Sequence, residues 1–315
     1  MNLLMEKLNL HYGGKINMNK LKLLLITPLL LGGFSTSSDI KYANSSETDI
    51  EISSAITSNT SLFLKSNYKI TTDFKVDNVL DDKIPFDPNK IKTYLDFTNF
   101  WIKPLTMLIK ELGRKGSKKY VIEFFNHLQL CYFSAAKVYK ICMTTTNRPK
   151  YYQNRGFRLI HFFDPHYLCV PSLHVSLISL VWSFYRRILP EITIFSEDIK
   201  NQFLDELYKD AIKICEAVLY VKQHSVNCIP AALYMMTFLL PNDFSCEDGI
   251  QFLKDLFVNT EIPIEDQKEL KDYMYFIFER FLLVGITDGN WIAPIKSWLK
   301  EYCINSNQEE IAKQI

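Results

Sequence analysis

The sequence is poor in glycine and proline, which number 10 and 12 among its 315 residues. Folds that are rich in β-strands use both residues for their many tight turns, so this scarcity argues against such a fold. The alternation of apolar and polar residues that marks a half-buried strand is also missing, and no internal repeat is found. The expected fold class is therefore all-α.

The chain also lacks an excess of charge of either sign. Lys and Arg number 36 and Asp and Glu number 35, so no overall positive field exists to attract a polynucleotide, and no nucleic-acid partner is expected. The mean hydropathy of −0.03 is too low for a chain made mostly of transmembrane helices. Because residues 168–185 and 226–240 are strongly apolar, a membrane-integral form remains open beside a soluble or peripherally attached domain.

Paired cysteines are absent as well. The chain has 7 cysteines, and none of them forms a C-x-x-C pair of the kind that structural zinc sites use. His161 and His166, taken together with His174, match no ligand spacing either. We therefore expect no metal site and no cofactor, and we expect most of the cysteines to be buried thiols. They are Cys131, Cys142, Cys169, Cys215, Cys228, Cys246 and Cys303.

Residues 18–38 have the plan of a secretory signal peptide. A basic start precedes an apolar run at 21–31, and small residues follow it. The run is shorter than the roughly 20 residues that a membrane-spanning helix needs. A hydrophobic first helix or an uncleaved anchor are the alternatives. Residues 1–17 do not fit the plan, and we expect the true start at Met18. The expected location is the periplasm or the cell envelope.

Three regions are expected after this segment. Residues 39–89 are rich in Ser, Thr, Asn and Asp and are predicted to be a partly disordered segment. Residues 90–305 form the predicted all-α domain, and 306–315 a polar tail. Within the domain, apolar spacing predicts a kink or break at Pro104 and a turn at 113–117. Helices are predicted at 118–145, 172–189 and 196–223, with a connecting loop at 146–170.

The stretch LCVPSLHVSLISL, residues 168–180, places polar groups in an otherwise apolar helix. Ser172 stands at the predicted helix start, where its hydroxyl and the free backbone N–H groups can face an anion. His174 follows inside the apolar run. A buried imidazole without a partner is costly, which favours a functional role over that of a satisfied core histidine.

Two further segments carry cations and a second histidine. KICMTTTNRPK contains Lys140 and Arg148, and YVKQHSVNC contains Lys222 and His224. Arginine offers a planar fork of donors to phosphate oxygens, and lysine a compact charge. One histidine can attack phosphorus while another protonates the leaving oxygen. The expected partner is a phosphate-bearing small molecule or lipid.

These segments resemble the motifs of the type 2 phosphatidic acid phosphatase and vanadium haloperoxidase superfamily. Its motifs are Lys, six residues, then Arg-Pro; Pro-Ser-x-His; and Ser-Arg, five residues, His, three residues, Asp. The resemblance covers roughly residues 137–240, and it is closest to members with PSLH and KQH forms. It implies a helical bundle of that superfamily's type.

The resemblance also implies roles for single residues. His224 corresponds to the nucleophile that forms a phosphohistidine, and His174 to the general acid for the leaving group. Arg148 corresponds to the phosphate clamp, and Ser172 to a phosphate-binding hydroxyl. Lys140 would add a charge to the same phosphate site, although its spacing from the arginine is one residue longer than the motif.

The third motif departs from the family in two positions. Its Arg falls on Val218, so that charge is absent, and Lys222 is the candidate to replace it as a substrate-binding residue. Its Asp falls on Cys228. A thiol is a poor hydrogen-bond acceptor, so His224 is expected to be less basic and less firmly held. Asp164 is a candidate substitute from the connecting loop.

The resulting expectation is an exported, metal-independent phosphatase that works through a phosphohistidine on a phosphomonoester or lipid phosphate. A lipid headgroup phosphotransferase is one alternative. A degenerate, non-catalytic helical module that binds an anion or acts at a surface is the other. The aromatic-rich segment YYQNRGFRLIHFF, residues 151–163, suggests peripheral contact with a membrane, with a packed loop as its alternative.

Overall fold

The computed structural model describes residues 74–163, 166–313 and 315, and this part of the chain is predominantly helical, which confirms the all-α class. The N-terminal extension and the signal peptide predicted for residues 1–38 lie outside the described residues, as does Asp164. None of the helices in the described part combines the length and the apolar character that a membrane span requires.

The helices follow one another with short connections, and a small parallel pair of strands closes one end. The 3₁₀ helices are η1 (Val79–Lys83), η2 (Pro88–Lys90) and η3 (Leu189–Glu191), and the strands are β1 (Phe74–Lys75) and β2 (Thr144–Thr145). The α-helices are α4 (Ile91–Ile141), α5 (Arg155–Phe163), α6 (Leu173–Ile188), α7 (Glu197–Tyr220), α8 (Cys228–Leu239), α9 (Cys246–Asp255), α10 (Ile264–Asp288), α11 (Ile292–Asn305) and α12 (Glu309–Ala312).

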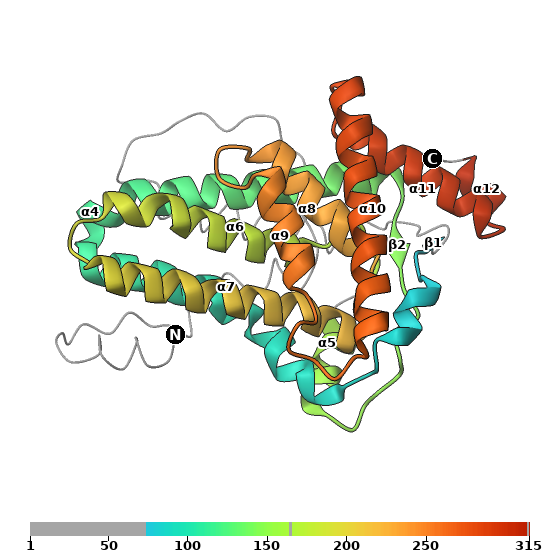
Figure 1. The fold of residues 1–315 in the computed structure, drawn as a ribbon, viewed down its shortest axis with the longest axis horizontal. Coiled ribbons are helices and arrows are strands. Elements are labelled where there is room, and N and C mark those ends of the chain that lie inside the picture. Colours follow the sequence, from blue (N-terminus) through green and yellow to red (C-terminus); the bar gives the residue numbers. More distant parts are fainter. Residues whose placement is uncertain (1–73, 164–165, 314) are drawn as a thin grey trace.

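The long helix α4 turns back on itself at Gly113 (Figure 1). Gly113 has φ of 67° and ψ of 171°, and this left-handed backbone suits glycine because it has no Cβ. The hydroxyl of Ser117 donates to the Gly113 carbonyl at 2.8 Å and steadies the restart of the helix. The chain therefore reverses at Gly113, the first residue of the predicted turn, but residues 114–117 already belong to the second arm of the helix. Of the kink or break predicted at Pro104, the break does not occur, because the backbone there stays helical.

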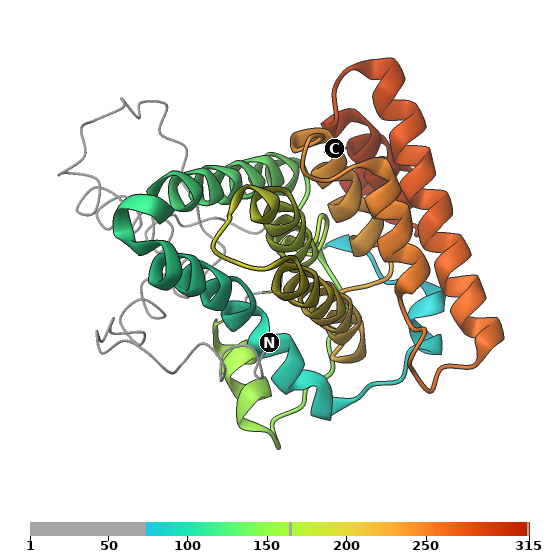
Figure 2. The same cartoon turned by 60° about the vertical axis from the view of Figure 1, so that its left-hand side comes forward.

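Two layers of helices enclose the core. Helices α6 and α7 pack against each other and against both arms of α4, and α8 continues this layer beside α6. Figure 2 shows the second layer, α10 and its neighbours α9 and α11, against α8. Helix α8 is almost wholly buried between the layers. Its apolar sequence thus reflects a central place in a helical protein.

The helix starts in the middle of the chain follow from capping. Ser172 is the N-cap of α6 and accepts from the backbone N–H of Val175. Ser196 is the N-cap of α7, which carries Glu197 and Asp198 in its first turn. Their negative charges interact favourably with the positive N-terminal end of the helix dipole and so stabilise the start of α7. Both helices therefore begin within a residue of their predicted starts.

Both ends of the described chain pack more than the sequence suggests. Phe74 and Val76 are fully buried, and β1 pairs in parallel with β2 through Phe74–Thr144 and Lys75–Thr145. The packed structure thus already includes residues 74–89, which were assigned to the polar N-terminal segment. At the other end, Ala312 of α12 is buried, so part of the predicted polar tail also folds onto the protein.

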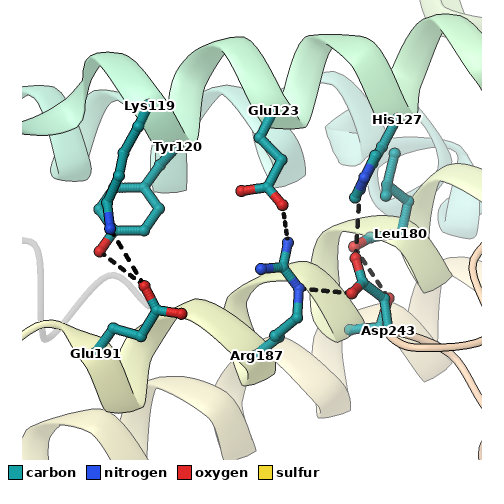
Figure 3. Close-up of polar contacts among 9 residues, drawn as sticks. Lys119, Tyr120, Glu123, His127, Leu180, Arg187, Glu191 and Asp243 are labelled. Carbon is teal, nitrogen blue, oxygen red and sulfur yellow. Dashed lines mark hydrogen bonds and ion pairs between the residues drawn. The ribbon is translucent and has the colours of Figure 1, made fainter.

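A row of ion pairs ties α4, α6 and the α8–α9 connection together (Figure 3). Arg187 binds Glu123 at 2.7 Å and Asp243 at 2.5 Å. On the other side of Asp243, the ring of His127 lies 3.3 Å from the carboxylate. Burial would raise the pKa of Asp243, but the contact with His127 and the charge of Arg187 outweigh it and lower the pKa. The carboxylate is therefore ionised and stabilising at neutral pH.

We predict that Asp243→Ala lowers the free energy of unfolding by about 2–4 kcal/mol, because it leaves a partly buried arginine without one of its carboxylates. The stabilisation is fully present above the ordinary carboxyl pKa of 3.8, and it is lost as the pH falls through the lower folded-state pKa. Urea unfolding at pH 7 measures the effect. Asp272→Ala, which removes the exposed Lys268–Asp272 pair, is the control and should cost at most about 0.5 kcal/mol. Equal losses in both variants would contradict the prediction.

Candidate functional site

Ser172, His174 and His224 meet at the N-terminus of α6. The Nε2 atom of His224 lies 3.2 Å from the Ser172 hydroxyl and 3.4 Å from Nδ1 of His174. The first two residues of this site come from the start of α6 and the third from the loop between α7 and α8, 50 residues further on. Three of the residues singled out in the sequence thus form one contact group.

The start of α6 is held by contacts from two other elements. The N–H of Ser172 donates to the Cys228 carbonyl at 3.3 Å, and the Tyr139 hydroxyl donates to the Pro171 carbonyl at 2.6 Å. Ser172 itself is fully buried. Its hydroxyl accepts from Val175 while it touches His224. The cap of the helix and the polar site therefore share one side chain.

The loop that carries His224 is a tight turn at the end of α7. The N–H groups of Gln223 and His224 both donate to the Val218 carbonyl, at 3.0 and 3.2 Å. Lys222 stands between them and the helix with φ of 55°. Val218, which the motif resemblance aligns with an arginine, thus contributes its backbone carbonyl to the turn that presents the histidine.

Residues 74–84, at the start of the described chain, form hydrogen bonds with this loop. Asp81 accepts from the N–H of Val226 at 2.9 Å, and Asn227 donates to the Val76 carbonyl at 2.9 Å. Residues far apart in the sequence thus hold the side of the loop that follows His224. The position of His224 therefore depends on residues 74–84, where no functional motif was predicted.

Lys222 does not join the histidines. Its ammonium group donates to the carbonyls of Asp81 and Ile84, each at 2.5 Å. Lys140, in the last turn of α4, is exposed, and within the described part of the chain neither lysine contacts a histidine of the site. The structure therefore does not bring together the two cations that were expected to bind substrate beside the arginine.

Arg148 contacts Gln223, a residue that the sequence patterns did not single out. Its guanidinium donates to the side-chain carbonyl of Gln223 at 3.0 Å. Gln223 is 1% exposed and directly precedes His224 in the chain. Its place between Lys222 and His224 in the KQH form of the motif was the only available signal. The amide thus holds Arg148 beside the loop that carries His224.

The two histidines of the site share a water-poor environment. His174 is half-buried and packs between the rings of Tyr94 and Phe97, with centroid distances of 4.8 and 4.7 Å. Burial lowers the pKa of His174 to about 4. Burial, followed by the proximity of His174 and His166, lowers the pKa of His224 well below its usual range. Both rings are therefore neutral at pH 7 when the site holds no anion.

In the described part of the chain, the second ring nitrogen of His224 has no carboxylate partner. Its Nδ1 atom is buried, and among the described residues it makes no hydrogen bond of good geometry. The backbone of Cys169 acts to raise the pKa of His224, but burial outweighs it. Cys228, which the motif resemblance aligns with an aspartate, is fully buried, and its sulfur accepts from the N–H of Ser225 at 3.4 Å. The expected weak support of His224 is consistent with this geometry.

A further histidine lies close to Arg148. His166 is buried, and its Nε2 atom lies 2.7 Å from the Thr146 hydroxyl. Burial, and then the charge of Arg148, lower the pKa of His166 to about 3. It is therefore a neutral hydrogen-bonding group beside the arginine. The residues that the structure describes contain no cluster of His, Cys, Asp or Glu suited to a metal ion.

Comparison of the chain with protein-family models, with curated proteins and with solved structures finds no match.

We predict that Gln223→Glu weakens the binding of inorganic phosphate at least tenfold, because a carboxylate 3.0 Å from Arg148 would neutralise its charge and repel the anion. Gln223→Ala should weaken binding less, since the arginine keeps its charge. Isothermal titration with phosphate measures both. Gln202→Glu, an exposed change on α7, is the matched control. Unchanged affinity in Gln223→Glu would place the anion away from Arg148.

Proposed function

We propose that this protein is a metal-independent phosphohydrolase that transfers phosphoryl groups through His224. The observation that carries the proposal is the convergence of His224 Nε2, His174 Nδ1 and the Ser172 hydroxyl within 3.4 Å at a helix N-terminus. Two histidines in contact provide a nucleophile and a proton donor, and a helix N-terminus favours an anion between them. The resemblance of the motifs to the type 2 phosphatidic acid phosphatase superfamily supports the same assignment.

The proposed reaction has two steps. In the first, the Nε2 lone pair of neutral His224 forms a bond to phosphorus while the bond from phosphorus to the ester oxygen breaks. The departing oxygen takes a proton from His174 and leaves as an alcohol. In the second, the oxygen of a water molecule forms a bond to phosphorus while the bond from phosphorus to Nε2 breaks and returns its electron pair to His224, and His174 accepts one proton of the water as inorganic phosphate leaves. Arg148 and the Ser172 hydroxyl stabilise the charge on the phosphoryl oxygens.

The proposed reaction needs a different protonation state from each histidine, and burial of the site favours only one of the two. A neutral His224 is the form needed for attack, and its lowered pKa maintains that form over the neutral range. A protonated His174 is the form needed for the leaving group, and its pKa of about 4 makes that form scarce at pH 7. A bound phosphate dianion stabilises the imidazolium and so raises the pKa of His174. The reaction is therefore favoured by acid.

A non-catalytic anion-binding module is the second candidate. It is favoured by one observation, namely that Nδ1 of His224 has no carboxylate partner in the described part of the chain. Without such a partner the ring is held less firmly in the tautomer that attacks. The same geometry would still allow Arg148 and the helix N-terminus to retain a phosphate group.

We predict that the wild-type protein hydrolyses p-nitrophenyl phosphate in the presence of a metal chelator, and that His224→Ala lowers kcat by at least about 10³-fold because it removes the nucleophile. His127→Ala, which changes a histidine in the ion-pair row, should retain activity and serves as the control. A folded wild type that binds phosphate without turnover would favour the binding module. Added alcohol that diverts phosphate into a new ester would favour the phosphotransferase alternative.

We also predict that kcat/KM rises as the pH falls from 8 to 5, because the fraction of protonated His174 increases toward its pKa of about 4. The comparison of wild type with His174→Asn isolates this effect from ionisation of the substrate. Their rate ratio should increase toward acid for phenyl phosphate, whose leaving group needs a proton. It should change less for p-nitrophenyl phosphate. A ratio that is independent of pH would remove His174 as the acid.

A further inference from the structure

We propose that the outer face of α5, formed by Arg155, Arg158, Leu159 and Phe162, docks onto an anionic lipid bilayer. These residues follow one another at helical spacing and lie on one side of the helix. All four side chains are exposed, with Phe162 81% exposed and Leu159 43%. The face therefore combines two cations with two apolar side chains, which is the composition of helices that lie in a membrane interface.

The opposite side of α5 attaches the helix to the protein. Phe157 and Ile160 are buried there, with exposed fractions of 0% and 1%. Gly156 lies so close to Ile91 and Leu95 of α4 that a Cβ would come within 2.9 and 3.1 Å of their side chains. The helix is thus fixed by its inner side, and its outer face is presented by a rigid support.

The segment around α5 carries charges of one sign only. Between residues 147 and 163 the sequence has four cations, Arg148, Lys150, Arg155 and Arg158, and no acidic residue. In the part of the chain that the structure describes, no carboxylate forms an ion pair with either arginine of the outer face. A local positive field therefore exists although the whole chain carries a net charge of only +1. Such a field attracts the anionic headgroups of a bilayer.

The exposed apolar side chains favour a bilayer, rather than a nucleic acid, as the anionic partner. Tyr152, just before the helix, is 56% exposed, and it adds to the apolar surface of Leu159 and Phe162. A single-stranded nucleic acid would use aromatic rings for stacking but would gain nothing from an exposed leucine. An interfacial helix gains free energy from all three, because leucine and aromatic side chains enter the region between headgroups and acyl chains.

The face adjoins the candidate site. After burial, the charge of Arg148 is the next cause that lowers the pKa of His161 on α5, so the helix lies close to the proposed phosphate clamp. The α4 turn that supports Gly156 also carries Tyr94, which packs on His174. Docking would thus bring the histidine pair to the headgroup layer. That consequence, a phosphate-bearing membrane lipid as substrate, rests on the proposed function, whereas the docking itself does not.

The first test is co-sedimentation of the full chain with phosphatidylcholine vesicles that contain or lack phosphatidylserine. We expect binding only with the anionic lipid. Arg155→Gln combined with Arg158→Gln should weaken it about 30-fold, at roughly 1 kcal/mol for each arginine. Lys209→Gln combined with Lys213→Gln, two exposed lysines of α7, is the matched control. Equal binding by both double variants, or equal binding to vesicles of either composition, would overturn the proposal.

The second test locates the contact. Phe162→Trp and Leu283→Trp each add one tryptophan at an exposed apolar position, the second on α10. With brominated anionic vesicles, the fluorescence added by Phe162→Trp should be quenched, and that added by Leu283→Trp should not. This readout is specific to position, so membrane binding by another segment of the chain does not imitate it. Quenching at 283 alone, or at neither position, would overturn the proposal.

Two further measurements separate this proposal from the proposed function. His224→Ala should bind vesicles like the wild type, whether or not the protein is an enzyme. The Arg155→Gln and Arg158→Gln double variant should keep its activity on soluble p-nitrophenyl phosphate and lose activity on phosphatidate in vesicles. Binding to a single-stranded oligonucleotide or to polyglutamate without binding to vesicles would reject the bilayer in favour of those partners.

Discussion

The contact between His224 and His174 depends on how the loop after α7 is held. That loop is a tight turn around the Val218 carbonyl, and its far side is hydrogen-bonded to Asp81 and to the Val76 carbonyl. Ser172 completes the arrangement by capping α6 while it touches His224. Since buried polar groups need partners, the same hydrogen bonds that satisfy the helix ends and the turn also determine where the imidazole points. The same network of hydrogen bonds thus stabilises the fold and sets the geometry of the site.

The environment of the histidines explains both the attraction and the weakness of the proposed chemistry. Burial keeps His224 neutral and thus nucleophilic, but burial also makes a protonated His174 scarce. A carboxylate at position 228 would orient His224 through Nδ1, whereas the chain has a thiol there. Arg148 is held near this region by the amide of Gln223. A site of this kind is suited to an anion that brings its own charge to balance the buried rings.

The exposed face of α5 offers positive charge to the proposed anionic bilayer. Helix α5 follows Arg148 in the chain and packs against the first turns of α4, with its exposed arginines and its exposed Phe162 on the opposite side. The apolar segments that suggested a membrane-integral form are instead the buried helices α6 and α8. Association with a bilayer, as proposed, would therefore involve one helical face and leave the core intact.

The sequence by itself determined the helical class, the starts of α6 and α7 and the turn at Gly113, because capping residues, apolar spacing and glycine act over a few neighbouring residues. It also singled out Ser172, His174 and His224, since polar groups inside apolar runs stand out locally. Only the tertiary structure decided that Lys222 turns to the carbonyls of Asp81 and Ile84, that Gln223 holds Arg148, and that residues 74–84 support the loop. Those choices join parts of the chain that are far apart in sequence, and local patterns carry no information about which distant partner a side chain will find.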